Sequence, residues 1–69
     1  MKPRTINRDY PPRRPRVGDM IATWFSDEPS GLSRVLAVSP YEGRYPQWFK
    51  WNLRVTAPRT RRGWMEICA

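Results

Sequence analysis

Residues 47–56, QWFKWNLRVT, decide the fold of this chain. Apart from Trp48, apolar and polar residues alternate strictly. The apolar positions are Phe49, Trp51, Leu53 and Val55. Successive side chains of a β-strand point to opposite faces, so this pattern predicts a strand with one buried face and one wet face. Lys50 and Arg54 would lie in line on the wet face, with Trp48 at its end.

The segments on either side of this strand predict three more strands. Residues 19–25, 32–39 and 64–68 are short apolar runs rich in β-branched or aromatic side chains. Turn-forming Gly and Pro residues separate them, in residues 26–31, 40–46 and 57–63. No segment has a helical period. The sequence therefore predicts an all-β domain, a small antiparallel barrel of four to five strands.

A core for so short a chain must come from a few large side chains. A domain of this size buries only about 60% of its unfolded surface, and Cys68 is the only cysteine, so no internal disulfide can reinforce it. The four Trp, three Tyr and two Phe supply the bulk. We expect a folding unit of residues 17–69, with four aromatic residues in its core: Trp24, Phe49, Trp51 and Trp64.

The first predicted strand is entered through residues 16–21, RVGDMI. This step resembles the opening of SH3-like small barrels of the Tudor, KOW and integrase C-terminal kind, in which Val-Gly-Asp leads into the first strand. The resemblance implies such a barrel over residues 17–68. The chain lacks the acidic, Tyr-rich loops with which eukaryotic SH3 domains grip proline motifs. In style it is also similar to small basic accessory proteins of bacteriophages and mobile elements.

Residues 1–16 form a Pro-rich segment that we call the basic arm. Proline restricts the backbone to extended shapes, so the arm is expected to be extended or disordered outside the fold. Its cations either keep the protein soluble as a solvated tail, or neutralise phosphates and enter a minor groove. They are Lys2, Arg4, Arg8, Arg13, Arg14 and Arg16.

The charge balance points to a polyanionic partner, since 13 Lys and Arg face 6 Asp and Glu for a net charge of +7. We expect the arm and one side of the barrel to bind nucleic acid, DNA or RNA, through Arg–phosphate contacts and aromatic stacking, with little sequence readout. The candidate barrel residues are Arg34, Trp48, Lys50, Arg54, Arg59, Arg61 and Arg62.

An alternative is a protein-interaction or inhibitor module that docks on an acidic surface of a larger host protein. The loop of residues 41–48 gathers three aromatic side chains around Gly and Pro, and such a loop either packs on its own barrel or is held out for recognition. Its candidate partner-binding residues are Tyr41, Arg44, Tyr45 and Trp48.

Enzymatic chemistry is not expected. The chain has no His, which is the commonest general base and metal ligand, and Cys68 therefore has no partner for a thiolate pair. The glycines are isolated turn residues, so no phosphate-cradling loop is present. We expect no catalytic residue, metal, cofactor or small-molecule substrate. Without a long apolar run or disulfides, a cytoplasmic protein with no membrane partner is expected.

Overall fold

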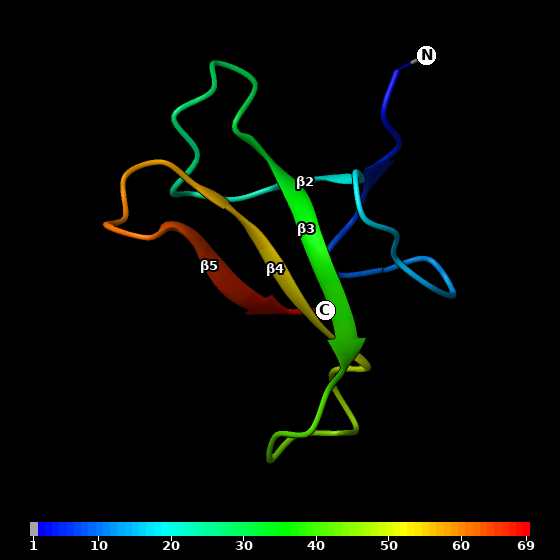
Figure 1. Cartoon of the computed structure of the whole chain (residues 1–69). Coiled ribbons are helices and arrows are strands. Elements are labelled where there is room, and N and C mark those ends of the chain that lie inside the picture. The colour runs from blue at the N-terminus through cyan, green and yellow to red at the C-terminus, as the bar shows by residue number, and fades with distance from the viewer. Residues whose placement is uncertain (1) are drawn as a thin grey trace.

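Five strands form one open sheet in the computed structural model, which describes residues 2–69 (Figure 1). In chain order, which is also sheet order, they are β1 (Thr5–Ile6), β2 (Met20–Ala22), β3 (Leu32–Pro40), β4 (Trp51–Ala57) and β5 (Gly63–Cys68). No helix, and so no apolar helix long enough to cross a membrane, occurs in residues 2–69. The all-β prediction is confirmed. The sheet is mixed instead of purely antiparallel, because β1 pairs with β2 in parallel.

The long strand β3 joins two halves of the sheet. It pairs with β2 through its first residues and with β4 from Val35 onward. The register with β4 shifts between Val35 and Ala37, so Leu36 is the extra residue of a β-bulge. A bulge bends its strand and increases the local twist. In Figure 1, β2 accordingly crosses the first part of β3 at a steep angle, whereas β4 runs alongside β3.

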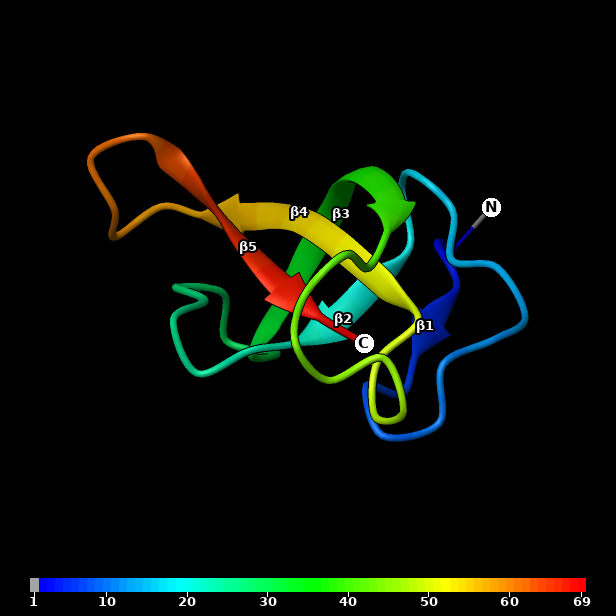
Figure 2. The same cartoon turned by 90° about the horizontal axis from the view of Figure 1, so that it is seen from below.

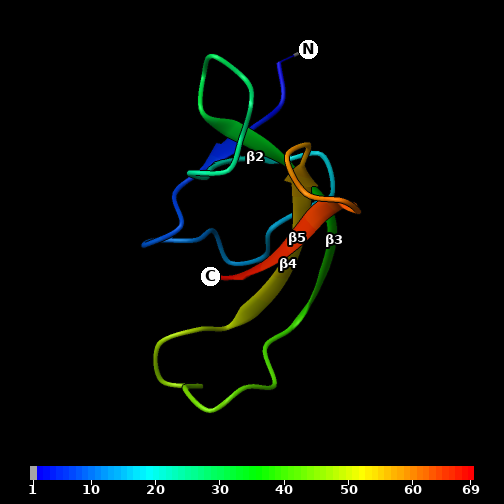
Figure 3. The ribbon, with the colours of Figure 1, turned by 90° about the vertical axis from the view of Figure 1, so that its left-hand side faces the viewer.

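The core lies on one face of the sheet. In β4, Leu53, Val55 and Ala57 are buried while the residues between them are partly exposed, which confirms the predicted alternation. Buried apolar residues from the other elements complete the cluster: Ile6, Ile21, Phe25, Val35, Ile67 and Ala69. Figure 3 shows β1 and much of the basic arm on one side of the layer formed by β3, β4 and β5.

Strand β4 begins at Trp51, whereas the alternation predicted a start at residue 47. The backbone N–H groups of Trp48 and Phe49 both donate to the carbonyl oxygen of Tyr45, at 2.9 and 3.2 Å. These bonds fold residues 45–48 into a turn. Trp48 and Lys50 therefore lie outside the strand whose wet face they were expected to share with Arg54.

Trp24 is the clearest error among the predicted core residues, because 82% of it is exposed. Strand β2 ends at Ala22, and residues 24–25 form a turn in which the strand alternation no longer holds. The neighbouring Phe25 takes the buried position instead, with its ring edge-to-face to that of Trp24. Of the other three, Trp51 packs against the core, while Phe49 and Trp64 are partly exposed.

The basic arm is part of the fold, although the folding unit was expected to start at Val17. Ile6 of β1 belongs to the core and Pro15 is fully buried. The N–H of Met20 donates to the carbonyl of Arg4 at 2.7 Å, which holds β1 against β2. Figure 2 shows the arm looping beside β1, at the opposite side of the sheet from β5.

The role of Ile6 gives a first prediction. Replacing Ile6 by alanine is expected to lower the free energy of unfolding by about 2 kcal/mol, because it leaves a void in the core. In a domain of this size that lowers Tm by roughly 10 °C in a thermal melt followed by circular dichroism. The exposed neighbour supplies the control, as Thr5→Ala should change Tm little. An equal Tm for the wild type and Ile6→Ala would show that the arm does not stabilise the fold.

Candidate nucleic-acid interface

Three of the predicted cations are neutralised within the molecule. Arg4 pairs with Asp19 at 2.7 Å, Arg54 pairs with Glu66 at 3.3 Å, and Arg59 pairs with Asp27. Within residues 2–69, the other predicted cations have no carboxylate within 4 Å. These are Lys2, Arg8, Arg13, Arg14, Arg16, Arg34, Lys50, Arg61 and Arg62. Most of the predicted positive charge therefore has no partner in the described part of the chain.

The pair of Arg4 and Asp19 is structural. Asp19 is 5% exposed and accepts hydrogen bonds from Nε and Nη2 of Arg4, at 3.1 and 2.7 Å, and from the backbone N–H of Arg16 at 2.8 Å. The bonds from Arg4 and then from Arg16 hold the pKa of Asp19 below its ordinary value. Arg4 thus fastens the basic arm to the start of β2, and we no longer count it as a candidate ligand residue.

The wet face of the sheet carries an aromatic and cationic group that we call the sheet-face cluster: Arg54, Arg62, Trp64 and Glu66. The register places Arg54 opposite Glu66 across the two neighbouring strands β4 and β5. The guanidinium carbon of Arg54 lies 3.9 Å from the centroid of the Trp64 ring, and that of Arg62 lies 5.2 Å from it. Cation–π attraction therefore holds both guanidinium groups at the Trp64 ring, and the Glu66 carboxylate also holds that of Arg54.

Hydrogen bonds from Asn52 and Arg54 also hold the pKa of Glu66 below its ordinary value, so this carboxylate stays ionised beside the cluster. This carboxylate neutralises the charge of Arg54 only. Within residues 2–69, Arg62 and its neighbour Arg61 have no carboxylate partner within 4 Å.

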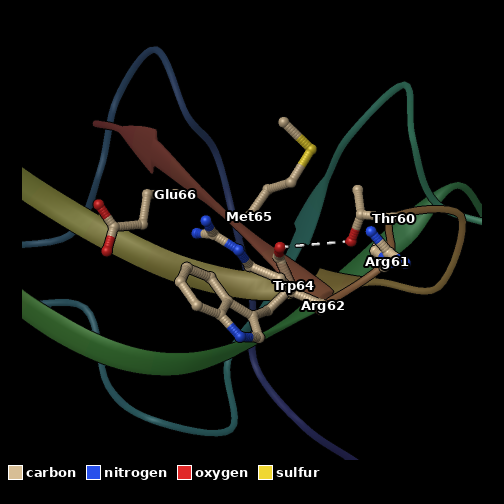
Figure 4. Close-up of a pocket in the computed structure, with 6 residues that line it drawn as sticks. All are labelled: Thr60, Arg61, Arg62, Trp64, Met65 and Glu66. Atoms are coloured by element: carbon tan, nitrogen blue, oxygen red, sulfur yellow. Dashed lines mark hydrogen bonds between the residues drawn. The ribbon is translucent and has the colours of Figure 1, made fainter.

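A shallow hollow lies beside the cluster, where the loop between β4 and β5 meets β5 (Figure 4). It is lined by Thr60, Arg61, Arg62, Trp64, Met65 and Glu66. The Thr60 hydroxyl donates to the carbonyl of Ala57 at 2.7 Å and accepts the N–H of Gly63 at 3.1 Å, and Gly63 adopts a φ of 78° that favours glycine. Both Arg61 and Arg62 of this tight turn line the hollow, with Arg61 beside Thr60 and Arg62 reaching toward Glu66 (Figure 4).

Neither Arg34 nor Arg59 is among the described residues that line this hollow. The N–H of Arg34 donates to the hydroxyl of Thr56 at 2.9 Å, and its exposed side chain lines a second hollow beside the loop between β2 and β3. Arg59 is tied to Asp27 of that same loop. Of the three loop arginines predicted as ligands, Arg61 and Arg62 therefore have no carboxylate partner in the part of the chain that the structure describes.

Trp48 and Lys50 do not join the sheet-face cluster. They precede β4, whereas Arg61 and Arg62 follow it, so the two groups lie at opposite ends of that strand (Figure 1). Trp48 and Lys50 line a separate depression that we call the Trp48 hollow. Its other lining residues are Asp9, Tyr10, Pro11, Pro12, Arg13 and Ala69. The one continuous cationic surface that the sequence predicted is therefore divided in two.

Tyr10 is the residue of this hollow that sequence reasoning missed. It is 82% exposed. The predicted ligands of the arm are all cations. The sequence signal for Tyr10 is its position, an aromatic residue directly before Pro11 and Pro12 in a basic segment.

The remaining arm cations lie along the fold. Arg8 donates from Nε to the carbonyl of Cys68 at 3.1 Å. Arg14 and Arg16 are exposed beside the buried Pro15, and their carbonyl and N–H groups bond to Arg4 and Asp19 respectively. These bonds hold the side chain of Arg8 and the backbone at Arg14 and Arg16 against the rest of the fold.

Of the four predicted partner-binding residues, one packs inside its own loop and three are exposed. Tyr41 packs its ring against Phe49, with centroids 5.3 Å apart, and its hydroxyl accepts the N–H of Tyr45 at 3.2 Å. A side chain at Gly43 would collide with this ring, which explains the glycine. Arg44 is exposed, and Tyr45 stacks on Trp48. Tyr41 therefore supports the loop, while the other three reach the solvent.

No protein-family model matches this chain, and no curated protein or solved structure does so. In the described part of the chain, no three His, Cys, Asp or Glu side chains gather into a potential metal site. The sheet-face cluster and the Trp48 hollow are therefore the candidate binding surfaces of this protein.

Proposed function

We propose that this protein binds nucleic acid through contacts between its arginines and phosphate groups. One observation carries the proposal: two guanidinium groups lie over a single indole ring on the open sheet face, beside a hollow that holds a third, unpaired arginine. These are Arg54 and Arg62 over Trp64, with Arg61 alongside.

The geometry suits phosphate because arginine offers a planar fork of N–H donors that matches two phosphate oxygens. Trp64 and Glu66 restrain Arg54, so less side-chain freedom is lost when a ligand arrives. Among residues 2–69, Arg61 and Arg62 have no carboxylate within 4 Å, so a phosphate would not have to displace one. Phosphate contacts carry no sequence information, so binding should discriminate poorly among sequences.

We also propose that residues 17–68 form a small barrel of the SH3-like kind. The antiparallel succession β2–β3–β4–β5 is compatible with the SH3-like barrels that the Val-Gly-Asp step resembles. The parallel pairing of β1 with β2 is an additional feature of this chain.

The proposal is tested by titrating the protein against duplex DNA, single-stranded DNA and RNA at two salt concentrations. If about six phosphates are neutralised, affinity should fall roughly a thousandfold between about 50 and about 200 mM salt. Affinity that does not change with salt, or the absence of binding to all three ligands at low salt, would contradict the proposal. Tight binding to an acidic protein alone would favour the protein-interaction alternative.

A matched pair of variants separates direct contacts from net charge. Arg61→Gln and Arg59→Gln remove one charge each from the same loop, but only Arg59 is already paired, with Asp27. If unpaired guanidinium groups contact phosphate, Arg61→Gln should weaken binding and lower the salt slope by about one, whereas Arg59→Gln should leave the slope unchanged. Equal effects of both variants would mean that binding follows total charge only.

A further inference from the structure

The Trp48 hollow combines two exposed aromatic rings with two cations. Tyr10 and Trp48 are 82% and 68% exposed, although rings of this size are usually more buried. Both line the same depression, together with the exposed side chains of Arg13 and Lys50. Neither cation has a carboxylate within 4 Å among residues 2–69. The hollow therefore offers flat apolar surface and unpaired positive charge at one place.

The Trp48 ring is held before any ligand arrives. It stacks on Tyr45, with centroids 4.9 Å apart and planes inclined by only 13°. The backbone N–H of Trp48 donates to the Tyr45 carbonyl at 2.9 Å, and the backbone N–H of Lys50 donates to the carbonyl of Ala69 at the same distance. On the other wall, Pro11 and Pro12 restrict the backbone that follows Tyr10. A second planar ring placed on Trp48 would continue the existing stack at little cost in side-chain freedom.

We propose that the Trp48 hollow binds an unpaired nucleobase of a single strand, with the base stacked on Trp48 and the flanking phosphates on Lys50 and Arg13. This inference rests on the proposed function and adds the kind of nucleic acid. Bases inside a duplex are stacked on each other and cannot reach a protein ring, whereas single-strand binders combine a cationic groove with stacking rings.

Asp9 is the one acidic side chain that lines the hollow. Its backbone is fixed by a bond from its N–H to the side-chain oxygen of Asn7, at 2.9 Å. A carboxylate repels phosphate but accepts the N–H groups of a base edge, so it suits the base and disfavours a phosphate alone.

The experiment compares Trp48→Ala with Trp24→Ala. Both replace an exposed tryptophan, but Trp24 lies in a different loop and does not line the hollow. Fluorescence anisotropy would follow the binding of a labelled oligothymidylate of about twelve nucleotides and of a duplex of the same length. Trp48→Ala should weaken oligothymidylate binding about tenfold or more, because one base loses its stacking partner. Trp24→Ala should leave this binding within about twofold of the wild type, and neither variant should change duplex binding.

Further readouts keep the outcomes distinct. Tyr10→Ala should also weaken oligothymidylate binding, and thermal melts should show that all three variants fold like the wild type, since these rings lie outside the core. If Trp48→Ala and Trp24→Ala bind oligothymidylate equally well while duplex binding is retained, the base site is wrong and the proposed function stands. If the wild type binds neither nucleic acid at low salt, both proposals fail.

Discussion

Leu53→Ala is expected to lower the free energy of unfolding by about 3 kcal/mol, a large part of the total for so small a domain. Leu53 is 0% exposed. It lies in the middle of β4, opposite Val38 on one neighbouring strand and Ile67 on the other. Truncation would remove apolar contacts from both neighbours at once and leave a cavity that the surrounding strands can fill only in part. The loss is measured by urea unfolding followed by tryptophan fluorescence.

Leu36→Ala is the control, because it makes the same chemical change at an exposed site instead of a buried one. Leu36 is the bulged residue of β3 and is 40% exposed. Its truncation should change the free energy of unfolding by less than about 0.5 kcal/mol, as surface substitutions usually do. Similar losses for the two variants would mean that the core is not centred on β4.

Asp19→Asn should lower the free energy of unfolding by about 2 kcal/mol. The carboxylate of Asp19 is buried and accepts hydrogen bonds from Arg4 and from the N–H of Arg16. Asparagine keeps the shape, but it loses the charge and can accept fewer of these bonds, which are stronger when one partner is ionised. Asp9→Asn is the control, because Asp9 is exposed and has no ion pair in residues 2–69.

The same carboxylate makes stability depend on pH. Its hydrogen bonds, first with Arg4, lower its pKa in the folded state. Its stabilising effect is therefore present above the ordinary aspartate pKa of about 3.9, and it is lost as the pH falls through the lower, folded-state pKa. In acid, the unfolding free energy of the wild type should fall toward that of Asp19→Asn. A constant difference between the two proteins from neutral pH down to about pH 2 would contradict this assignment.

The sequence predicts the parts of this fold whose signal is local. The alternation around Leu53 and Val55 identifies β4 because each residue faces the core or the solvent in turn. β1 has no such signal: it is two residues long, and its partner β2 lies about 15 residues further along the chain. The only hint is Ile6, an isolated apolar residue among cations and prolines.

In the candidate site, too, local features can be predicted from the sequence and long-range contacts cannot. The number of cations can be counted in the sequence, but their pairing depends on tertiary structure. Arg59 meets Asp27 across 32 residues, and the turn at Tyr45 removes Lys50 from the strand that contains Arg54. By contrast, the structure supplies a reason for the Val-Gly-Asp step: Gly18 adopts a φ of 96°, and Asp19 becomes the buried acceptor of the arm.

The unequal pairing of the two halves of the sheet has a consequence for hydrogen exchange. β1 pairs with β2 through two residues and β2 pairs with β3 through three, whereas β4 is paired with β5 from Asn52 to Ala57. Lightly paired segments open locally more often than the rest of a domain. Amide protons of β1 and the arm should therefore exchange with deuterium sooner than those of β4. Because the arm carries Tyr10, each such opening would also separate Tyr10 from Trp48 in the hollow that we propose as the base site.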